Sequence, residues 1–192
     1  MPPASAPGSA ATLDGLLARV AQGDRQALAA LYQALEKPVY RFVQGKLNDP
    51  TQSADIVHGV FLEVWRSAPR FEGRSAARTW VFGIAYRKVI DVFRAQARLL
   101  VTDEVPETED DSPAALDCLA MAQANDRLRH CLDRLKPDHR SAIDLAFFED
   151  MGYRDIAEVM AVSEGTVKTR IFHAKKLLQH CLGQFGIVGD RA

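Results

Sequence analysis

Polar, basic and aromatic residues that suit DNA recognition gather on one short stretch near the C-terminal end of the chain. From Gly165 to Leu178, residue types alternate at a spacing that gives a helix one polar face and one apolar face. The outward residues are Gly165, Lys168, Thr169, Phe172, His173 and Lys176, and the inward ones are Val167, Ile171, Ala174 and Leu178. The outward face offers hydrogen bonds to base edges, an apolar contact and cations for phosphates, which suits a major groove. The alternative is an ordinary solvated basic helix, and an outward Phe172 argues against it.

A second, shorter helix is expected just before this one, from Tyr153 to Ala161. A tight turn at Val162 and Ser163 joins the two helices, and Ser163 is a suitable N-cap for the second. The small Ala157 lies where the helices must cross closely. Two short helices joined in this way form a helix-turn-helix, the motif that places its second helix in the major groove.

A further basic and aromatic face is expected on a helix from about Thr79 to Arg98. At about 100° per residue, an apolar stripe occupies one side of this helix and a polar, aromatic stripe the other. The apolar side holds Val81, Phe82, Ala85, Tyr86, Val89, Val92 and Phe93, and the opposite side holds Trp80, Arg87, Asp91, Arg94 and Arg98. Aromatic rings beside arginines suit unstacked bases and the nucleic-acid backbone. Burial of Trp80 under the preceding loop is the alternative for that residue.

The net charge of −1 conceals a strong separation of charge along the chain. Arginines dominate residues 66–98, whereas residues 99–118 hold seven acids and no base. This acidic strip contains Pro106 and Pro113 and lacks apolar periodicity, so it is expected to be a flexible linker between two helical modules. We predict an all-α chain with a disordered N-terminus (1–12), a first domain (13–98), the linker (99–117), a second domain (118–183) and a tail (184–192).

Two further helices in the first module, around residues 28–43 and 56–65, are expected from apolar spacing, with Ser53 as the N-cap of the second. No apolar run is long enough to span a bilayer, so we expect a cytoplasmic protein without membrane insertion. Three scattered cysteines argue against a disulfide framework. We find no nucleophile signature, phosphate loop, cofactor site or zinc site, and therefore expect no enzyme.

The stretch from Asp150 to Leu178 closely resembles the promoter-binding helix-turn-helix of extracytoplasmic-function (ECF) sigma factors, a branch of the sigma-70 family. Residues 55–65, DIVHGVFLEVW, resemble the helix of that family that grips the clamp of the polymerase largest subunit. Residues 71–74, FEGR, and 78–85, RTWVFGIA, resemble the loop and helix that bind the start-proximal promoter element. The resemblance extends from about Leu13 to Leu182 and implies sigma region 2, the linker and sigma region 4.

The resemblance also implies roles for individual residues. The upstream (−35) duplex would be read by Lys168, Thr169, Phe172 and His173, with Arg170 and Lys176 nearer phosphates. The −10 element would be held as single strand by Arg74, Arg78, Trp80, Arg87 and Arg94, with a pocket beside Gly73 accepting an unstacked base. The polymerase clamp would be bound by Asp55, His58, Phe61, Leu62 and Trp65. Where the family usually has Gln followed by an acid, this chain has His58-Gly59.

The implied partners are core RNA polymerase, through its clamp and flap, promoter DNA and an anti-sigma factor that controls a stress response. Two other classes of protein remain possible at this stage. A stand-alone helix-turn-helix regulator would bind a palindromic operator as a dimer but would not need the arginine-rich helix of the first module. An adaptor that binds polymerase without DNA would leave the outward face around Phe172 unexplained.

Overall fold

The computed structural model describes residues 12–100 and 116–185, and within these ranges it contains helices and no strand, as predicted. The helices are α1 (Leu13–Val20), α2 (Arg25–Leu47), α3 (Pro50–Ser67), α4 (Ala77–Leu100), α5 (Leu116–Asp133), α6 (Pro137–Ile143), α7 (Tyr153–Met160) and α8 (Glu164–Gly183). A 3-10 turn, η1 (Ala68–Arg70), follows α3, and a π-helical turn, η2 (Asp144–Phe148), follows α6. The expected N-terminal segment, acidic linker and tail fall almost wholly outside the described residues.

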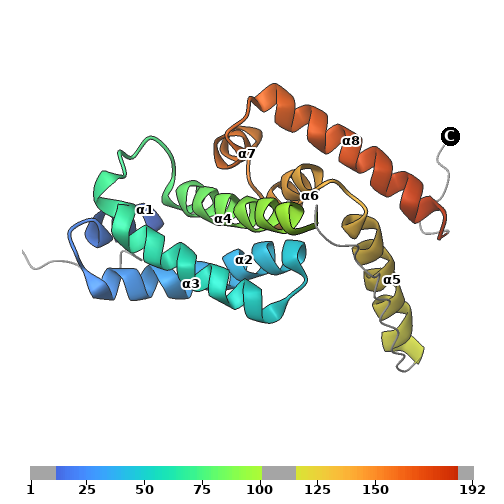
Figure 1. The fold of residues 1–192 in the computed structure, drawn as a ribbon, viewed down its shortest axis with the longest axis horizontal. Coiled ribbons are helices and arrows are strands. Elements are labelled where there is room, and N and C mark those ends of the chain that lie inside the picture. Colours follow the sequence, from blue (N-terminus) through green and yellow to red (C-terminus); the bar gives the residue numbers. More distant parts are fainter. Residues whose placement is uncertain (1–11, 101–115, 186–192) are drawn as a thin grey trace, which may run out of the picture.

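The first module consists of α1 to α4, and its buried apolar residues belong to a core that continues into the second module (Figure 1). Asp24 caps the N-terminus of α2: its Oδ1 accepts hydrogen bonds from the backbone N–H groups of Ala27 and Gln26. The hydrogen bond from Ala27, together with that from the Arg19 guanidinium, holds the pKa of this carboxyl below its usual value. The prediction that Ser53 caps α3 is wrong. Asp49 is the cap and accepts from Gln52 N at 2.9 Å, while Ser53 lies buried one turn inside the helix. Asp49 precedes Pro50, the first residue of the helix, where a missing N–H costs nothing.

Helix α4 has the two faces expected of it, with one addition. Val81, Phe82, Ala85 and Val89 are completely buried against the first module, and the predicted polar residues Arg87, Asp91, Arg94 and Arg98 are exposed. Gly83 and Ile84, which lie close to the line of Trp80 and Arg87, are also buried. A Cβ built on Gly83 would lie 4.0 Å from Cα of Val159 in α7, so the second module covers the first half of this face.

The second module consists of α5 to α8. Helix α5 ends at Asp133, and Pro137 is the first residue of α6. Helices α7 and α8 form the predicted helix-turn-helix: Ala161 turns the chain with a φ of 52°, and Ser163 caps α8 by accepting from Thr166 N at 3.1 Å. The inward residues Val167, Ile171 and Ala174 are buried, which confirms the predicted packing face.

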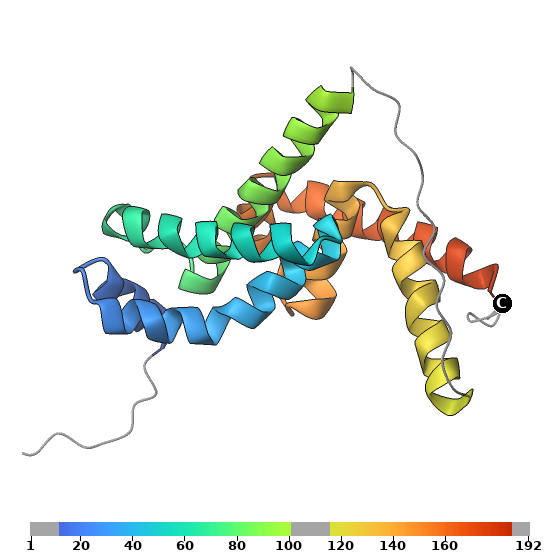
Figure 2. The same ribbon diagram turned by 60° about the horizontal axis from the view of Figure 1, so that its bottom comes forward.

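The two modules lie against each other, with α4 between α1–α3 on one side and α6–α8 on the other (Figure 1). The C-terminal part of α4 and the N-terminal part of α5 extend away from the body (Figure 2). None of the described helices combines the length and apolar character that a membrane span needs.

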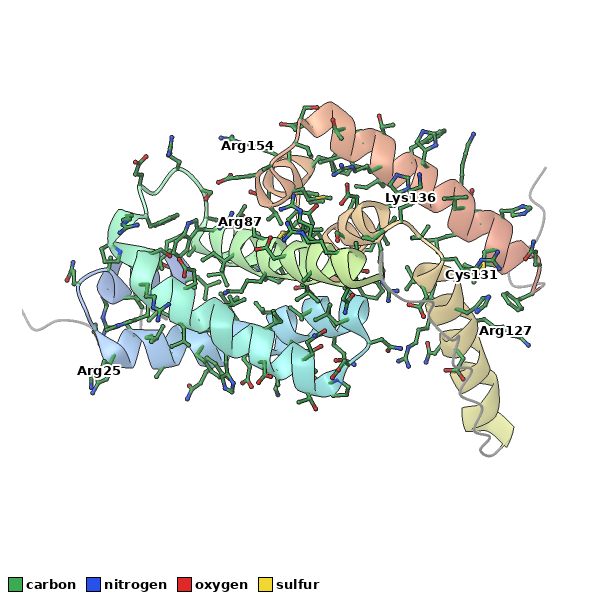
Figure 3. The ribbon with its side chains drawn as sticks, in the orientation of Figure 1. Arg25, Arg87, Arg127, Cys131, Lys136 and Arg154 are labelled. Carbon is green, nitrogen blue, oxygen red and sulfur yellow. A yellow bond between two sulfur atoms is a disulfide. The ribbon has the colours of Figure 1, made fainter. Side chains whose placement is uncertain are left out.

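A disulfide joins Cys131 of α5 to Cys181 of α8, a bond that the argument against a disulfide framework did not foresee. The two residues are 50 positions apart in sequence, but the ends of α5 and α8 meet in space and bring their Cα atoms to 5.8 Å (Figure 3). That distance falls within the range that disulfides bridge. Sequence spacing alone could not reveal this meeting of helix ends.

Candidate nucleic-acid and polymerase interfaces

The outward face of α8 presents Lys168, Thr169, Phe172, His173 and Lys176 to solvent, as predicted. The Phe172 side chain is 56% exposed although it is fully apolar. Lys176 Nζ lies 4.7 Å from the centre of its ring, and the His173 ring meets it edge-on at 5.7 Å. Cation and ring contacts of this kind hold the three side chains together without burying them. The face is thus a pre-formed ridge that combines apolar surface, hydrogen-bonding groups and positive charge.

Arg170 lies apart from this ridge. It is partly buried and forms an ion pair with Asp138 of α6 at 2.7 Å. The same carboxylate accepts a hydrogen bond from the Tyr86 hydroxyl of α4 at 3.1 Å. Burial and this neighbouring charge raise the pKa of Tyr86 to about 12. The ion pair with Asp138 therefore fixes the Arg170 side chain within the protein. Arg154, which sequence reasoning did not select, extends outward from α7 (Figure 3).

The predicted residues of the first module's DNA face occupy different environments. Arg87 and Arg94 are exposed, and Arg74 is exposed beside Glu72 at 2.9 Å. Trp80 is half-buried, with its ring centre 5.0 Å from that of Phe71 in the preceding loop. The alternative considered for Trp80, burial by that loop, is thus partly correct.

A cavity of about 750 Å³ lies beside Gly73, between α1 and the loop that precedes α4. Gly73 has a φ of +70°, which only glycine adopts without strain. At the cavity wall, Asp14 of α1 accepts a hydrogen bond from Ala77 N at 2.6 Å and so ties α1 to the first turn of α4. The volume is in the range of small-ligand pockets. The cavity lies where the sequence placed a base-accepting pocket, and its occupation by a base stays a prediction.

The predicted clamp face lies on α3. Asp55, His58 and Leu62 are exposed, Trp65 is partly buried and Phe61 is 4% exposed, so Phe61 is a core residue that shapes the face from beneath. An apolar groove of about 480 Å³ runs between α2 and α3, and Leu28, Tyr32, His58, Phe61 and Leu62 contribute to its walls. The groove suits an apolar helix from another protein.

Gly59, one of the two departures from the family pattern, makes room for a neighbour. A Cβ at this position would lie 3.4 Å from Nζ of Lys88 in α4, the closest of three contacts with that side chain. The lysine side chain therefore lies over α3 at Gly59, where an added Cβ would be in van der Waals contact with it.

A polar cluster that sequence reasoning missed joins the two modules. Glu149, just after η2, receives two arginines from the first module: Arg41 Nη2 at 2.6 Å and Arg78 Nη2 at 2.7 Å. Lys46 of α2 donates to Asp144 of η2 at 2.6 Å. Complete burial lowers the pKa of Lys46 to about 8, although Asp144 opposes the shift. Arg78, expected to hold DNA, is thus bound to the protein in this structure.

Among the described residues, no group of three or more His, Cys, Asp or Glu side chains is arranged to hold a metal ion.

Comparison with protein families matches residues 31–99 to sigma-70 region 2 and residues 125–178 to sigma-70 region 4. The chain is 30% identical to the ECF RNA polymerase sigma factor SigK of Mycobacterium sp. strain JLS over 175 residues, 89% of this chain and 91% of that protein. It is 29% identical to SigK of Mycolicibacterium vanbaalenii over 177 residues, 90% of either chain. A region 2 followed by a region 4 defines a sigma-70-type factor. The chain belongs to the ECF family of RNA polymerase sigma factors, which are transcription initiation factors that bind RNA polymerase and promoter DNA.

Two solved structures share the fold. CnrH, in complex with the cytosolic domain of CnrY, aligns with a TM-score of 0.68 at 23% identity over 90% of this chain and 98% of its own. The sigma factor RpoE of Bartonella quintana, in complex with the anti-sigma factor NepR, aligns with a TM-score of 0.65 at 22% identity over 79% of this chain and 94% of its own. From here, region 2 denotes α1–α4 and region 4 denotes α5–α8.

Proposed function

We propose that this sigma factor reads the upstream promoter element with the exposed ridge of α8 and holds the opened −10 strand with the exposed face of α4. The exposure of Phe172 at 56% is the observation that carries the first assignment. An exposed phenylalanine on a capped recognition helix, flanked by Lys168, Thr169 and Lys176, suits base methyl groups and phosphates in one groove. On a purely solvated helix most of the ring surface would stay in contact with water.

The −10 assignment rests on the surroundings of α4. Arg87 and Arg94 follow the outward side of the helix, and Trp80 and the cavity beside Gly73 lie at its N-terminal end. Cations on the helix would track the strand, and the cavity would accept a base that has left the stack. Each stacked base contributes about 1 to 3 kcal/mol, which offsets the loss of base pairing without hydrolysis by this chain.

The α3 face and its groove would bind the polymerase clamp, and we propose that a cytoplasmic anti-sigma factor competes for it under stress control. The support is the apolar groove lined by Tyr32, His58 and Leu62. The structural relatives CnrH and RpoE were solved in complex with the cytosolic domain of CnrY and with the anti-sigma factor NepR, respectively. One apolar helix from a partner would cover the exposed Leu62 and exclude the clamp from it.

A reconstituted transcription reaction tests the assignment. Purified core RNA polymerase, this protein and a library of promoter fragments should yield run-off transcripts from a defined subset of fragments. Phe172→Ala and Lys168→Ala should lose that selectivity, while Lys175→Ala, on the same helix but outside the ridge, should retain it. Tight binding to duplex DNA without polymerase would instead indicate a stand-alone regulator, and no transcript with any fragment would refute the proposal.

A further inference from the structure

A pocket of about 510 Å³ lies between the C-terminal half of α4 and the start of α6, and we call it the α4–α6 pocket. Both modules contribute to its lining, and Lys136, in the connection between α5 and α6, belongs to the side of region 4 (Figure 3). Its volume falls in the range of small-ligand sites. The cavity beside Gly73 and the groove beside Tyr32 already have roles in the proposed function, whereas this pocket has none.

One part of the lining of the α4–α6 pocket is apolar and includes an aromatic ring. Ile90, Phe93 and Ala97 recur at helical spacing on one side of α4. Pro137, the first residue of α6, adds to this lining. Ile90 and Phe93 are only partly buried, so each keeps some surface open to a ligand. An aromatic ring beside aliphatic side chains suits a flat, apolar group such as a nucleobase.

The other part of the lining carries an excess of positive charge. Three cations, Arg94, Lys136 and Arg170, line the pocket with a single carboxylate, Asp138, which leaves an excess of two positive charges. That carboxylate is already engaged, because it pairs with Arg170 at 2.7 Å. Arg94 also lies 3.5 Å from Asp91, but the two side chains are 69% and 70% exposed, so this pair is weak. The pocket therefore suits a ligand with more than one negative charge.

Two polar groups of the lining residues lack hydrogen-bond partners. Nη1 of Arg170 and Nδ1 of His139 are buried, and neither has a partner in the part of the chain that the structure describes. Buried polar groups in folded proteins nearly always have a partner, so each exception needs a reason. Burial, the His173 ring and nearby cations together lower the pKa of His139. The ring therefore lies in an electropositive environment, which a bound anion would neutralise.

We propose that the α4–α6 pocket binds a free nucleotide, with its base against Phe93 and its phosphates among the three cations. Guanidinium and ammonium groups are the usual protein ligands of phosphate. The base accounts for the apolar lining, and the phosphates account for the excess of positive charge. An inorganic anion would leave the apolar lining in water, and an uncharged aromatic compound would leave the cations without a counter-charge.

The proposal goes beyond the function proposed above and does not depend on it. Arg94 also belongs to the α4 face that we assign to the −10 strand, so a nucleotide within a DNA strand is the competing occupant. The other lining residues lie outside that face, which favours a free nucleotide. The experiment below includes the DNA strand as one of its outcomes.

Isothermal titration of the full-length chain, without polymerase or DNA, tests the proposal. The probes are the four ribonucleoside triphosphates, their nucleosides and inorganic triphosphate, in EDTA so that no divalent cation shields the phosphates. At least one nucleoside triphosphate should bind one to one. The corresponding nucleoside and inorganic triphosphate should each bind at least about tenfold more weakly, because each makes only part of the contacts.

Two substitutions separate the phosphate contacts from the base contact. Lys136→Gln should weaken binding of the triphosphate about tenfold and leave that of the nucleoside unchanged. The Lys136 side chain makes no capping hydrogen bond to α6, so this substitution should preserve the fold. Phe93→Leu stays apolar but removes the ring, and should weaken both ligands at least about fivefold. Lys175→Gln, on α8 outside the pocket, is the matched control and should bind as the wild type does.

The outcomes decide between the competing occupants. The proposal is overturned if no nucleoside triphosphate binds at about 1 mM, or if Lys136→Gln and Lys175→Gln lose affinity equally. Equal affinity for inorganic triphosphate would mean that the pocket holds an anion only. A short single-stranded oligonucleotide that binds more tightly than any nucleotide and depends on Lys136 would assign the pocket to DNA instead. Run-off transcription is scored separately, so a failure of the proposed function would leave these binding results standing.

Discussion

Nη2 of Arg78 lies 2.7 Å from Oε2 of Glu149, 71 residues further along the chain. This single contact joins the helix that carries the proposed −10 face to the turn that leads into the helix-turn-helix. Because Arg41 binds the other carboxylate oxygen at 2.6 Å, the same acid fixes two helices of region 2 at once. Glu149 therefore ties two helices of region 2 to the segment that precedes the helix-turn-helix.

The N-cap of α3 gives a prediction on stability. Asp49→Ala should lower the free energy of unfolding by about 1 kcal/mol, because it leaves the N–H of Gln52 without its acceptor. Ser53→Ala should change it little, because the buried Ser53 hydroxyl has no hydrogen-bond partner in this structure. Urea denaturation of the two variants measures the difference. Equal losses would show that the cap has been assigned to the wrong residue.

The ridge of α8 gives a prediction on promoter recognition. Phe172→Ala should weaken holoenzyme binding to a selected upstream element by about 1 to 3 kcal/mol, because a base-edge contact is lost. Its free energy of unfolding should stay within about 0.5 kcal/mol of the wild type, since the ring is exposed. Filter binding and thermal denaturation provide the two values. A large loss of stability together with unchanged DNA binding would mean that Phe172 serves packing instead.

The buried Lys46 gives a prediction on pH dependence. Its pKa is about 8 in the folded chain against an ordinary value of 10.5, so between these values the unfolded chain binds more protons than the folded one. The unfavourable contribution of burying this charge is therefore fully present below pH 8 and fades as the pH rises toward 10.5. Stability should rise over this window relative to Lys46→Met.

Urea denaturation at about pH 7 and about pH 9.5 measures this rise for wild type and Lys46→Met, and the difference between the two proteins isolates Lys46 from other titrating groups such as Tyr86. Asp144, Arg140 and Glu149 face the amine and remain in both proteins. Identical pH dependence in the two proteins would contradict the lowered pKa.

The Cys131–Cys181 disulfide gives a prediction on region 4. A cross-link that closes a loop of this length (separation 50) restricts the unfolded chain and contributes up to roughly 4 kcal/mol to stability. Dithiothreitol should therefore lower the melting temperature of the wild type. It should leave the double variant Cys131→Ser/Cys181→Ser unchanged, which serves as the control. A wild-type melting temperature that is insensitive to reductant would show that the bond adds nothing to folding.

Features with a local or periodic signature were predictable from the sequence. Phe172 and Val167 fall on opposite faces of α8 because apolar residues recur at helical spacing, and Ser163 stands directly before the helix that it caps. The family match confirms both modules and their order. Ser53 was a poorer choice of cap than Asp49 because Pro50, which directly follows Asp49, is itself the first helical residue.

Features that depend on contacts distant in sequence were not predictable. Glu149 and Lys46 were not singled out, because one sequence carries no sign that Arg41 or Asp144 will lie opposite them. Gly83 was not singled out within α4, and only the structure shows that α7 packs against it. The odd number of cysteines argued against pairing, yet the fold brings two of the three together.

The bond between Cys131 and Cys181 also turns the backbone from α6 through α8 into a closed ring. A protease that cuts once inside this ring, for instance in the turn around Val162, releases no fragment. The halves of the helix-turn-helix remain tethered and separate on a denaturing gel only after reduction. A cut within the helix-turn-helix of an oxidised molecule would therefore escape an assay that judges integrity by size without reduction.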